Sequence, residues 1–183
     1  MKNANPAVVG LAGFGLTTLL LQFHNLGLIG LGPVVAMGFI FGGLAQFLAG
    51  FGESKVGNNF GFSAFVAYGS FWIGLGIIWL LNHYDIYKSS TTDVGYYLVA
   101  WTLYTAIMFI ASLRVHVAMS VTFLTLLVGF ILLDLAHFGL PGAEPFAAID
   151  LIICAASAWY MMAAIIINDL AGKTVLPFGK KLI

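Results

Sequence analysis

Six apolar stretches of about 20 residues each, separated by short polar connections, dominate the sequence. A helix of about 20 apolar residues is long enough to cross the ~30 Å hydrocarbon core of a bilayer. The sequence therefore predicts an all-α integral membrane protein with a single six-helix transmembrane domain over residues 1–183. The predicted spans cover residues of about 7–24, 33–51, 60–81, 94–113, 117–138 and 146–168.

The composition agrees with a membrane protein and argues against several other classes. Only 8% of the residues are charged and 61% are hydrophobic, whereas soluble domains carry about 25% charged residues. The formal net charge is zero, so no basic surface indicates a nucleic-acid partner, and the expected surroundings are a lipid bilayer. Gly-rich phosphate loops and the common hydrolase motifs are also missing from the sequence, so we expect no catalytic residue and no cofactor.

The four histidines give no indication of a metal site. Each lies near the end of a predicted span, without the close pairing that a metal requires. We therefore expect no bound metal and interpret the histidines as interfacial residues. They are His24, His83, His116 and His137.

Positive charges are distributed unequally between the two ends of the predicted spans. With alternating directions, one side of the membrane receives six Lys and Arg residues and the other receives only Lys88. The positive-inside rule places the richer side in the cytoplasm, which predicts a multi-pass protein of the plasma (inner) membrane with both termini cytoplasmic. Glu53 and Lys55 share one turn on that side and are expected to be ordinary turn charges. The six positive residues are Lys2, Lys55, Arg114, Lys173, Lys180 and Lys181.

Two acidic residues fall inside predicted spans. Asp134 and Asp150 lie about four residues from the outer ends of spans five and six, which corresponds to a depth of roughly 6 Å. A carboxylate within the membrane usually faces a water-filled cavity or a partner, although both residues would also fit the headgroup zone. His137 follows Asp134 by one helical turn, on the same face. The three residues are candidates for a proton-linked role.

Three large side chains share one depth. Phe14, Tyr68 and Leu126 each lie about seven to nine residues into a span that runs from the cytoplasm outward. They therefore fall near mid-membrane, within one helical turn of each other. A ring of such side chains forms an apolar constriction that gates by excluding water; ordinary packing between helices is the alternative.

Short motifs in a fixed order run through nearly the whole chain. The segment from Asn5 to Leu11 reads N-P-A-V-V-G-L, and further motifs follow at Gly13 to Thr18, His24-Asn25, Gly57-Asn58, Phe60-Gly61, Ala64-Phe65, Tyr68 to Trp72, Cys154 with Ala156-Ser157-Ala158, and Thr174 to Pro177. These motifs resemble the acetate uptake transporter family, which includes the bacterial succinate–acetate permeases. The family signature N-P-A-P-L-G-L is kept at five of its seven positions, with departures at Val8 and Val9.

The resemblance implies a six-helix protomer similar to proton-gated urea channels, assembled as a homohexamer with one pore in each protomer. It also implies passage of acetate, succinate and related carboxylates, with proton coupling in many members. Motif by motif, the family's Phe, Tyr and Leu constriction falls on Phe14, Tyr68 and Leu126. This chain departs from the family pattern at Ile165, where bacterial members often carry a glutamate, and at Asp134 and Asp150, where they are apolar. Proton coupling is therefore expected to be arranged differently here, or to be absent.

The resulting prediction is a transporter or anion channel for acetate and other small carboxylates, moved with protons by symport. A carboxylate in transit would be held by neutral donors and by the N-terminus of span three. The predicted substrate-binding residues are Thr17, Thr18, Asn58 and Asn59, together with Ser157 and Ala158 from the matched motif of span six. Two alternatives remain. One is a channel for a small neutral solute such as urea or ammonia, and the other is a membrane-embedded enzyme using Asp134, His137 and Asp150.

Overall fold

The computed structural model describes residues 4–183, so Lys2, which contributes to the predicted charge asymmetry, lies outside the described part. The described chain forms the helices α1 (Ala7–Asn25), α2 (Gly32–Phe39), α3 (Gln46–Lys55), α4 (Asn59–His83), α5 (Thr91–Ser112), α6 (Val117–His137) and α7 (Glu144–Ala171). A π-helical segment, η1 (Ile40–Ala45), joins α2 to α3, and a short 3-10 turn, η2 (Pro141–Ala143), precedes α7. Six helical segments of this described part are long and apolar enough to cross a membrane, which confirms the predicted all-α membrane class.

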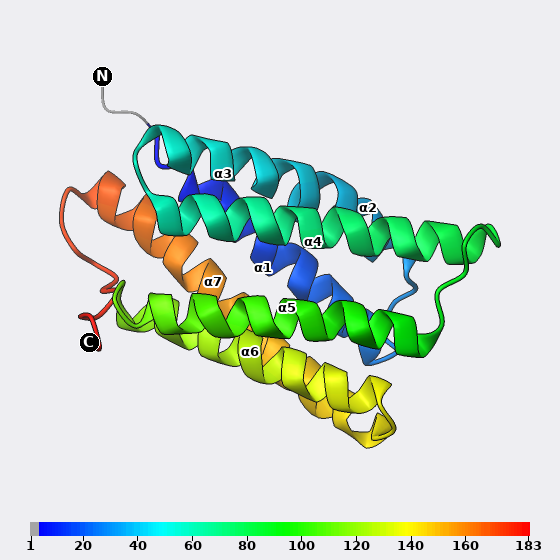
Figure 1. Cartoon of the computed structure of the whole chain (residues 1–183). Coiled ribbons are helices and arrows are strands. Elements are labelled where there is room, and N and C mark those ends of the chain that lie inside the picture. Colours follow the sequence, from blue (N-terminus) through cyan, green and yellow to red (C-terminus); the bar gives the residue numbers. More distant parts are fainter. Residues whose placement is uncertain (1–3) are drawn as a thin grey trace.

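The six segments lie alongside one another as a bundle, with the first described residues and the C-terminus at the same end (Figure 1). Helix α1 packs against α7 and against the α2–η1–α3 segment, while α6 packs against both α5 and α7. Helix α4 packs mainly against α3, and its backbone makes few close approaches to α5. Aromatic rings fill the space between α4 and α5, as in the stacked pair of Phe71 and Tyr97 at 5.8 Å. This loosely packed seam leaves room for cavities within the bundle.

The π-helical segment η1 allows the second span to pack against two different helices. Gly38 and Gly42 have the small-xxx-small spacing that the sequence links to close helix packing, but they approach different neighbours. A Cβ atom at Gly38 would lie 3.6 Å from the Trp72 carbonyl oxygen on α4, whereas one at Gly42 would lie 2.5 Å from Thr17 Oγ1 on α1. The wider π turn between α2 and α3 lets one continuous span meet both helices.

The last helix is longer than the sequence predicts. Helix α7 begins at Glu144, where Pro145 suits the first turn, and it continues to Ala171. Gly172 then ends the helix in the left-handed conformation, with φ of +63°, which glycine adopts without steric cost. After this glycine the tail returns to α6, where Val117 N–H and Ala118 N–H donate to the carbonyl oxygens of Lys180 and Phe178.

Candidate functional site: two cavities and an apolar barrier

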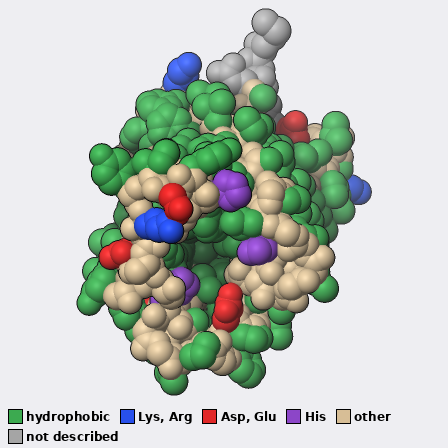
Figure 2. Space-filling model, turned by 90° about the vertical axis from the view of Figure 1, so that its right-hand side faces the viewer, with side chains coloured by type: hydrophobic (Ala, Val, Ile, Leu, Met, Phe, Trp, Pro, Cys, Tyr) green, Lys and Arg blue, Asp and Glu red, His purple; other side chains and the backbone are tan. Residues whose placement is uncertain are grey.

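Two cavities enter the bundle from opposite ends. The large cavity, of about 570 Å³, opens at the end where the first described residues and the C-terminus lie, and it is lined by α1, α3, α4, α6, α7 and the tail. The small cavity, of about 170 Å³, opens at the opposite end and includes His24, His137 and Glu144 in its lining. Figure 2 shows that opposite end, where a central hollow is surrounded by polar, histidine and acidic side chains within a largely hydrophobic molecule.

The two cavities approach each other to within one turn of α4. Tyr68 lines the large cavity and Phe71, three residues later, lines the small one. The same succession holds on α1, where Phe14 lines the large cavity and Leu21 the small one. Residues on a helix rise about 1.5 Å each, so roughly one helical turn separates the two cavities along α4 and roughly two turns separate them along α1.

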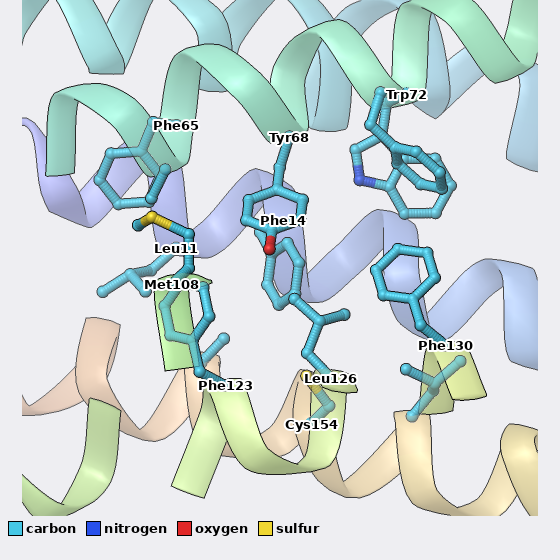
Figure 3. Packing of buried hydrophobic residues seen from close by; sticks show 14 of the residues in the cluster. Leu11, Phe14, Phe65, Tyr68, Trp72, Met108, Phe123, Leu126, Phe130 and Cys154 are labelled. Carbon is cyan, nitrogen blue, oxygen red and sulfur yellow. The ribbon is translucent and has the colours of Figure 1, made fainter. Parts of the chain in front are cut away.

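Phe14, Tyr68 and Leu126 form the closed end of the large cavity. They are contributed by α1, α4 and α6, and all three side chains are buried. The rings of Phe14 and Tyr68 meet edge to face, with their centroids 6.1 Å apart. In Figure 3 the side chains of Phe14 and Leu126 lie beside the ring of Tyr68. The three residues that the sequence places at one depth therefore also lie next to one another.

The Tyr68 side chain is held on several sides. Its hydroxyl group shares a 2.8 Å hydrogen bond with Thr105 Oγ1 on α5, in a buried position. Its ring contacts Trp101 and Phe123 at centroid distances of 5.9 and 6.1 Å. A buried hydroxyl that keeps one partner avoids the desolvation cost of an unpaired polar group. The hydrogen bond to Thr105 therefore orients the Tyr68 hydroxyl group toward α5.

A second apolar layer lies on the far side of Tyr68. The rings of Phe71 and Phe130 meet edge to face at 5.6 Å, and Phe71 also contacts Trp101 at 5.3 Å. Figure 3 places Phe130 at the same level as Trp72, beyond the Tyr68 layer. The barrier between the cavities therefore contains two successive layers of aromatic rings, of which the sequence predicts only the first.

The residues predicted to bind substrate occupy different environments. Thr17 and Thr18 are buried but line neither cavity, since Thr17 lies against Gly42 and donates to the Met37 carbonyl oxygen at 3.4 Å. Asn58 lines the large cavity, and its Oδ1 caps α4 by accepting from Gly61 N–H at 3.1 Å. Asn59 is exposed and lines neither cavity. Of these four residues, only Asn58 reaches the candidate site.

The span-six motif lies behind the wall of the large cavity. Ser157 Oγ shares a 2.7 Å hydrogen bond with Thr122 Oγ1, and Thr122 itself lines the cavity. Ala158 is fully buried at the helix interface. Both residues can affect the shape of the large cavity through α6, although neither is part of its surface.

Asp134 and Asp150 do not meet in one vestibule. Asp134 accepts a 2.6 Å hydrogen bond from Thr102 on α5, whereas Asp150 lies against Gly129 on α6. Asp134 and Asp150 line neither the large nor the small cavity, but His137 does line the small one. The two carboxylates lie at similar depths along their helices. They are on helix faces that point to different neighbours, so they do not meet.

Several polar residues of the large cavity were not predicted as site residues from the sequence, among them Gln46, Glu53 and His116. Glu53, expected to be an ordinary turn charge, is part of α3 and only 2% exposed. Gln46 precedes it by two helical turns and shares its face, and this spacing is the signal that could have identified both residues. Within residues 4–183, no cluster of His, Cys, Asp and Glu side chains has the proximity that a metal ion requires.

Two cavities separated by a thin apolar barrier, in a bundle of membrane-length helices, define a channel or transporter class. A model of the GPR1/FUN34/yaaH family matches residues 1–178, and the chain belongs to this family. This finding confirms the resemblance that the sequence motifs indicate.

Characterised relatives and a solved structure extend over nearly the whole chain. The succinate-acetate/proton symporter SatP of Escherichia coli strain K12 is 41% identical over 182 residues, covering 98% of this chain and 97% of that protein. Acetate permease A of Emericella nidulans is 35% identical over 191 residues, with coverages of 93% and 62%. The structure of the bacterial acetate channel SatP matches with a TM-score of 0.93 at 41% identity, covering 97% of this chain and all of that one (100%).

Proposed function

We propose that this protein moves acetate and related short-chain carboxylates across a membrane, together with a proton, through a pathway within each protomer. The observation that carries the proposal is the pair of cavities that approach each other across the layer of Phe14, Tyr68 and Leu126. The family membership and the relatives named for acetate transport support the same substrate class.

The apolar barrier favours passage of a neutral species. An ionised carboxylate that enters a ring of apolar side chains without a compensating partner loses its hydration at a high free-energy cost. The large cavity has no Lys or Arg in its described lining, so a fixed cation does not lower that cost. The protonated acid, or an anion accompanied by a proton, crosses more easily, which is the physical basis for the proposed coupling.

The proposal is tested by acetate uptake into proteoliposomes that contain the purified protein. Uptake should exceed that of protein-free liposomes and should increase when the source compartment is acidic. Competition by urea tests the alternative of a channel for a small neutral solute. A protein that conducts urea but not acetate under the same gradient would contradict the proposed substrate class.

Removal of the Tyr68 hydroxyl group tests its role in the barrier. Tyr68→Phe keeps the ring contacts and removes the hydrogen bond to Thr105, so acetate uptake should fall while the ratio of lactate to acetate uptake stays unchanged. Thr105→Val removes the partner and keeps its shape, and it should produce a smaller decrease because the Tyr68 hydroxyl remains. An increase in lactate uptake by Tyr68→Phe would show that the hydroxyl acts as a steric block instead.

The proposed topology places the large cavity and both termini in the cytoplasm. Tyr87 is 87% exposed in the α4–α5 connection, whereas Ser54 is exposed at the opposite end of the bundle. In intact cells, an impermeant thiol reagent should label Tyr87→Cys and leave Ser54→Cys unlabelled. The native Cys154 is fully buried and should give little background. Labelling of Ser54→Cys alone would reverse the proposed orientation.

We also propose that the protomers assemble as a homohexamer. Large apolar side chains cover the outside of the bundle, among them Ile40, Leu103 and Ile107, and such faces contact lipid or a neighbouring protomer. Native mass spectrometry from mild detergent should detect the hexamer. A stable monomer that still transports acetate after reconstitution would contradict this proposal.

A further inference from the structure

The N-terminus of α4 already holds a carboxylate of the chain. Asn58 Nδ2 donates a 2.6 Å hydrogen bond to Glu53 Oε2, while Asn58 Oδ1 accepts from Gly61 N–H. A Cβ atom added at Gly61 would lie only 2.9 Å from Glu53 Oε2, so the missing side chain at this position leaves space for the carboxylate. Glu53, Asn58 and Gly61 all line the large cavity.

The sequence predicts that a substrate carboxylate binds at this same location, the N-terminus of α4. Free backbone N–H groups and the helix dipole make the start of a long helix favourable for an anion. In the structure, Glu53 occupies that neighbourhood, and an ionised Glu53 repels a second carboxylate placed beside it. The chain's own anion and a substrate anion are thus competitors for one favourable region.

Among residues 4–183, no cation is paired with Glu53. Glu53 Oε1 is buried and has no hydrogen-bond partner among the described residues, and the same is true of Gln46 Oε1 on the same face of α3. The other titratable groups in the cavity lining are His116 and Tyr68. Burial holds the pKa of His116 below its usual range, and its Nδ1 accepts from Met119 N–H at 3.1 Å, so the ring is neutral at neutral pH. Lys55, on the same helix as Glu53, is exposed.

We propose that Glu53 is a resident anion that competes with the substrate carboxylate at the N-terminus of α4, so that a proton on Glu53 and an acetate in the large cavity bind cooperatively. A proton from the adjoining solution neutralises Glu53 and removes the repulsion, so that acetate can approach the N-terminus of α4. By linkage, bound acetate raises the affinity of Glu53 for the proton by the same factor. The inference rests on the proposed function and assigns its proton linkage to a residue of this chain.

The charge-neutral variant Glu53→Gln tests the coupling, because it resembles the protonated form and keeps an oxygen acceptor for Asn58. Binding is measured with purified protein by ¹³C-acetate NMR between about pH 6 and 8, where free acetate is ionised. The wild-type affinity for acetate should weaken as the pH rises, by up to about tenfold per pH unit, which is the limit for linkage to one proton. Glu53→Gln should bind acetate with an affinity that is nearly independent of pH, and it should bind acetate more tightly than the wild type at the upper end of this pH range.

A matched control removes a carboxylate elsewhere. Asp85 is exposed in the α4–α5 connection, where it pairs with Lys88, so Asp85→Asn should keep the wild-type pH dependence. Proton uptake provides a second readout: in weakly buffered solution, acetate addition should take up protons with the wild type and not with Glu53→Gln. Proton uptake that persists when acetate is added to Glu53→Gln would place the proton on the substrate or on another group, and it would overturn the inference.

The remaining outcomes separate the inference from the proposed function. If Glu53→Gln does not fold, infrared spectra of the wild type decide: addition of ¹³C-acetate should produce the C=O band of a protonated protein carboxyl group, and its absence would contradict the coupling. If the wild type transports acetate and Glu53→Gln does so with the same pH dependence, the role of Glu53 is refuted and the proposed function still stands. Absence of acetate transport by the wild type would refute the proposed function itself.

Discussion

Leu126→Ala is expected to increase lactate uptake relative to acetate uptake by about tenfold, since discrimination in an apolar pocket is worth about 1–3 kcal/mol per methylene. Leu126 is 5% exposed and lies at the closed end of the large cavity. The substitution removes three side-chain carbons and leaves the contact between Phe14 and Tyr68 in place. The measurement is competitive uptake of the two acids into proteoliposomes.

Leu124→Ala provides the control for Leu126→Ala. Leu124 is on the same helix, is 45% exposed and lines neither cavity, so the same chemical change there should leave the uptake ratio unaltered. A core Leu→Ala change also destabilises a protein by about 2–5 kcal/mol, and the thermal unfolding midpoint of each variant should therefore accompany its uptake data. An unchanged ratio in folded Leu126→Ala would show that Leu126 does not line the narrowest point.

Gly13→Ala is expected to cause a large loss of stability from a single added methyl group. A Cβ atom at Gly13 would overlap the backbone carbonyl oxygen of Phe41 in η1, and a backbone atom cannot move aside as a flexible side chain does. Overpacking of this kind costs about 1–3 kcal/mol and sometimes more. Because α1 also packs along α7, the strain cannot be relieved by moving the helix as a whole. Thermal unfolding in one detergent should show a clear decrease.

Gly38→Ala is the matched comparison for Gly13→Ala. A Cβ atom at Gly38 would lie 3.6 Å from the nearest atom, the Trp72 carbonyl oxygen, which is ordinary van der Waals distance. The added methyl group should therefore be neutral or stabilising by about 0.4–1 kcal/mol, through the lower entropy of the unfolded chain. Equal destabilisation by both variants would show that close contact between α1 and η1 is not what Gly13 provides.

The sequence predicts the features that depend on position along a helix axis. The lengths of the apolar stretches determine the number of membrane-length helices, because each must match the bilayer thickness. Depth follows from residue number at about 1.5 Å per residue. For this reason Phe14, Tyr68 and Leu126, on three helices that run in the same direction, were predicted to lie at one level, and the structure places them together.

Only the tertiary structure decides which way a side chain points around its helix. The spans are apolar on nearly every side, so a polar face does not indicate which neighbour a residue meets. Thr17 therefore lies against Gly42, and Asp134 meets Thr102 on α5, outside the cavities. The burial of Glu53 beside Asn58 also depends on tertiary structure, because it results from how the end of α3 crosses the start of α4. The sequence alone determines depth and span, whereas the crossing of the helices decides which side chains line the two cavities.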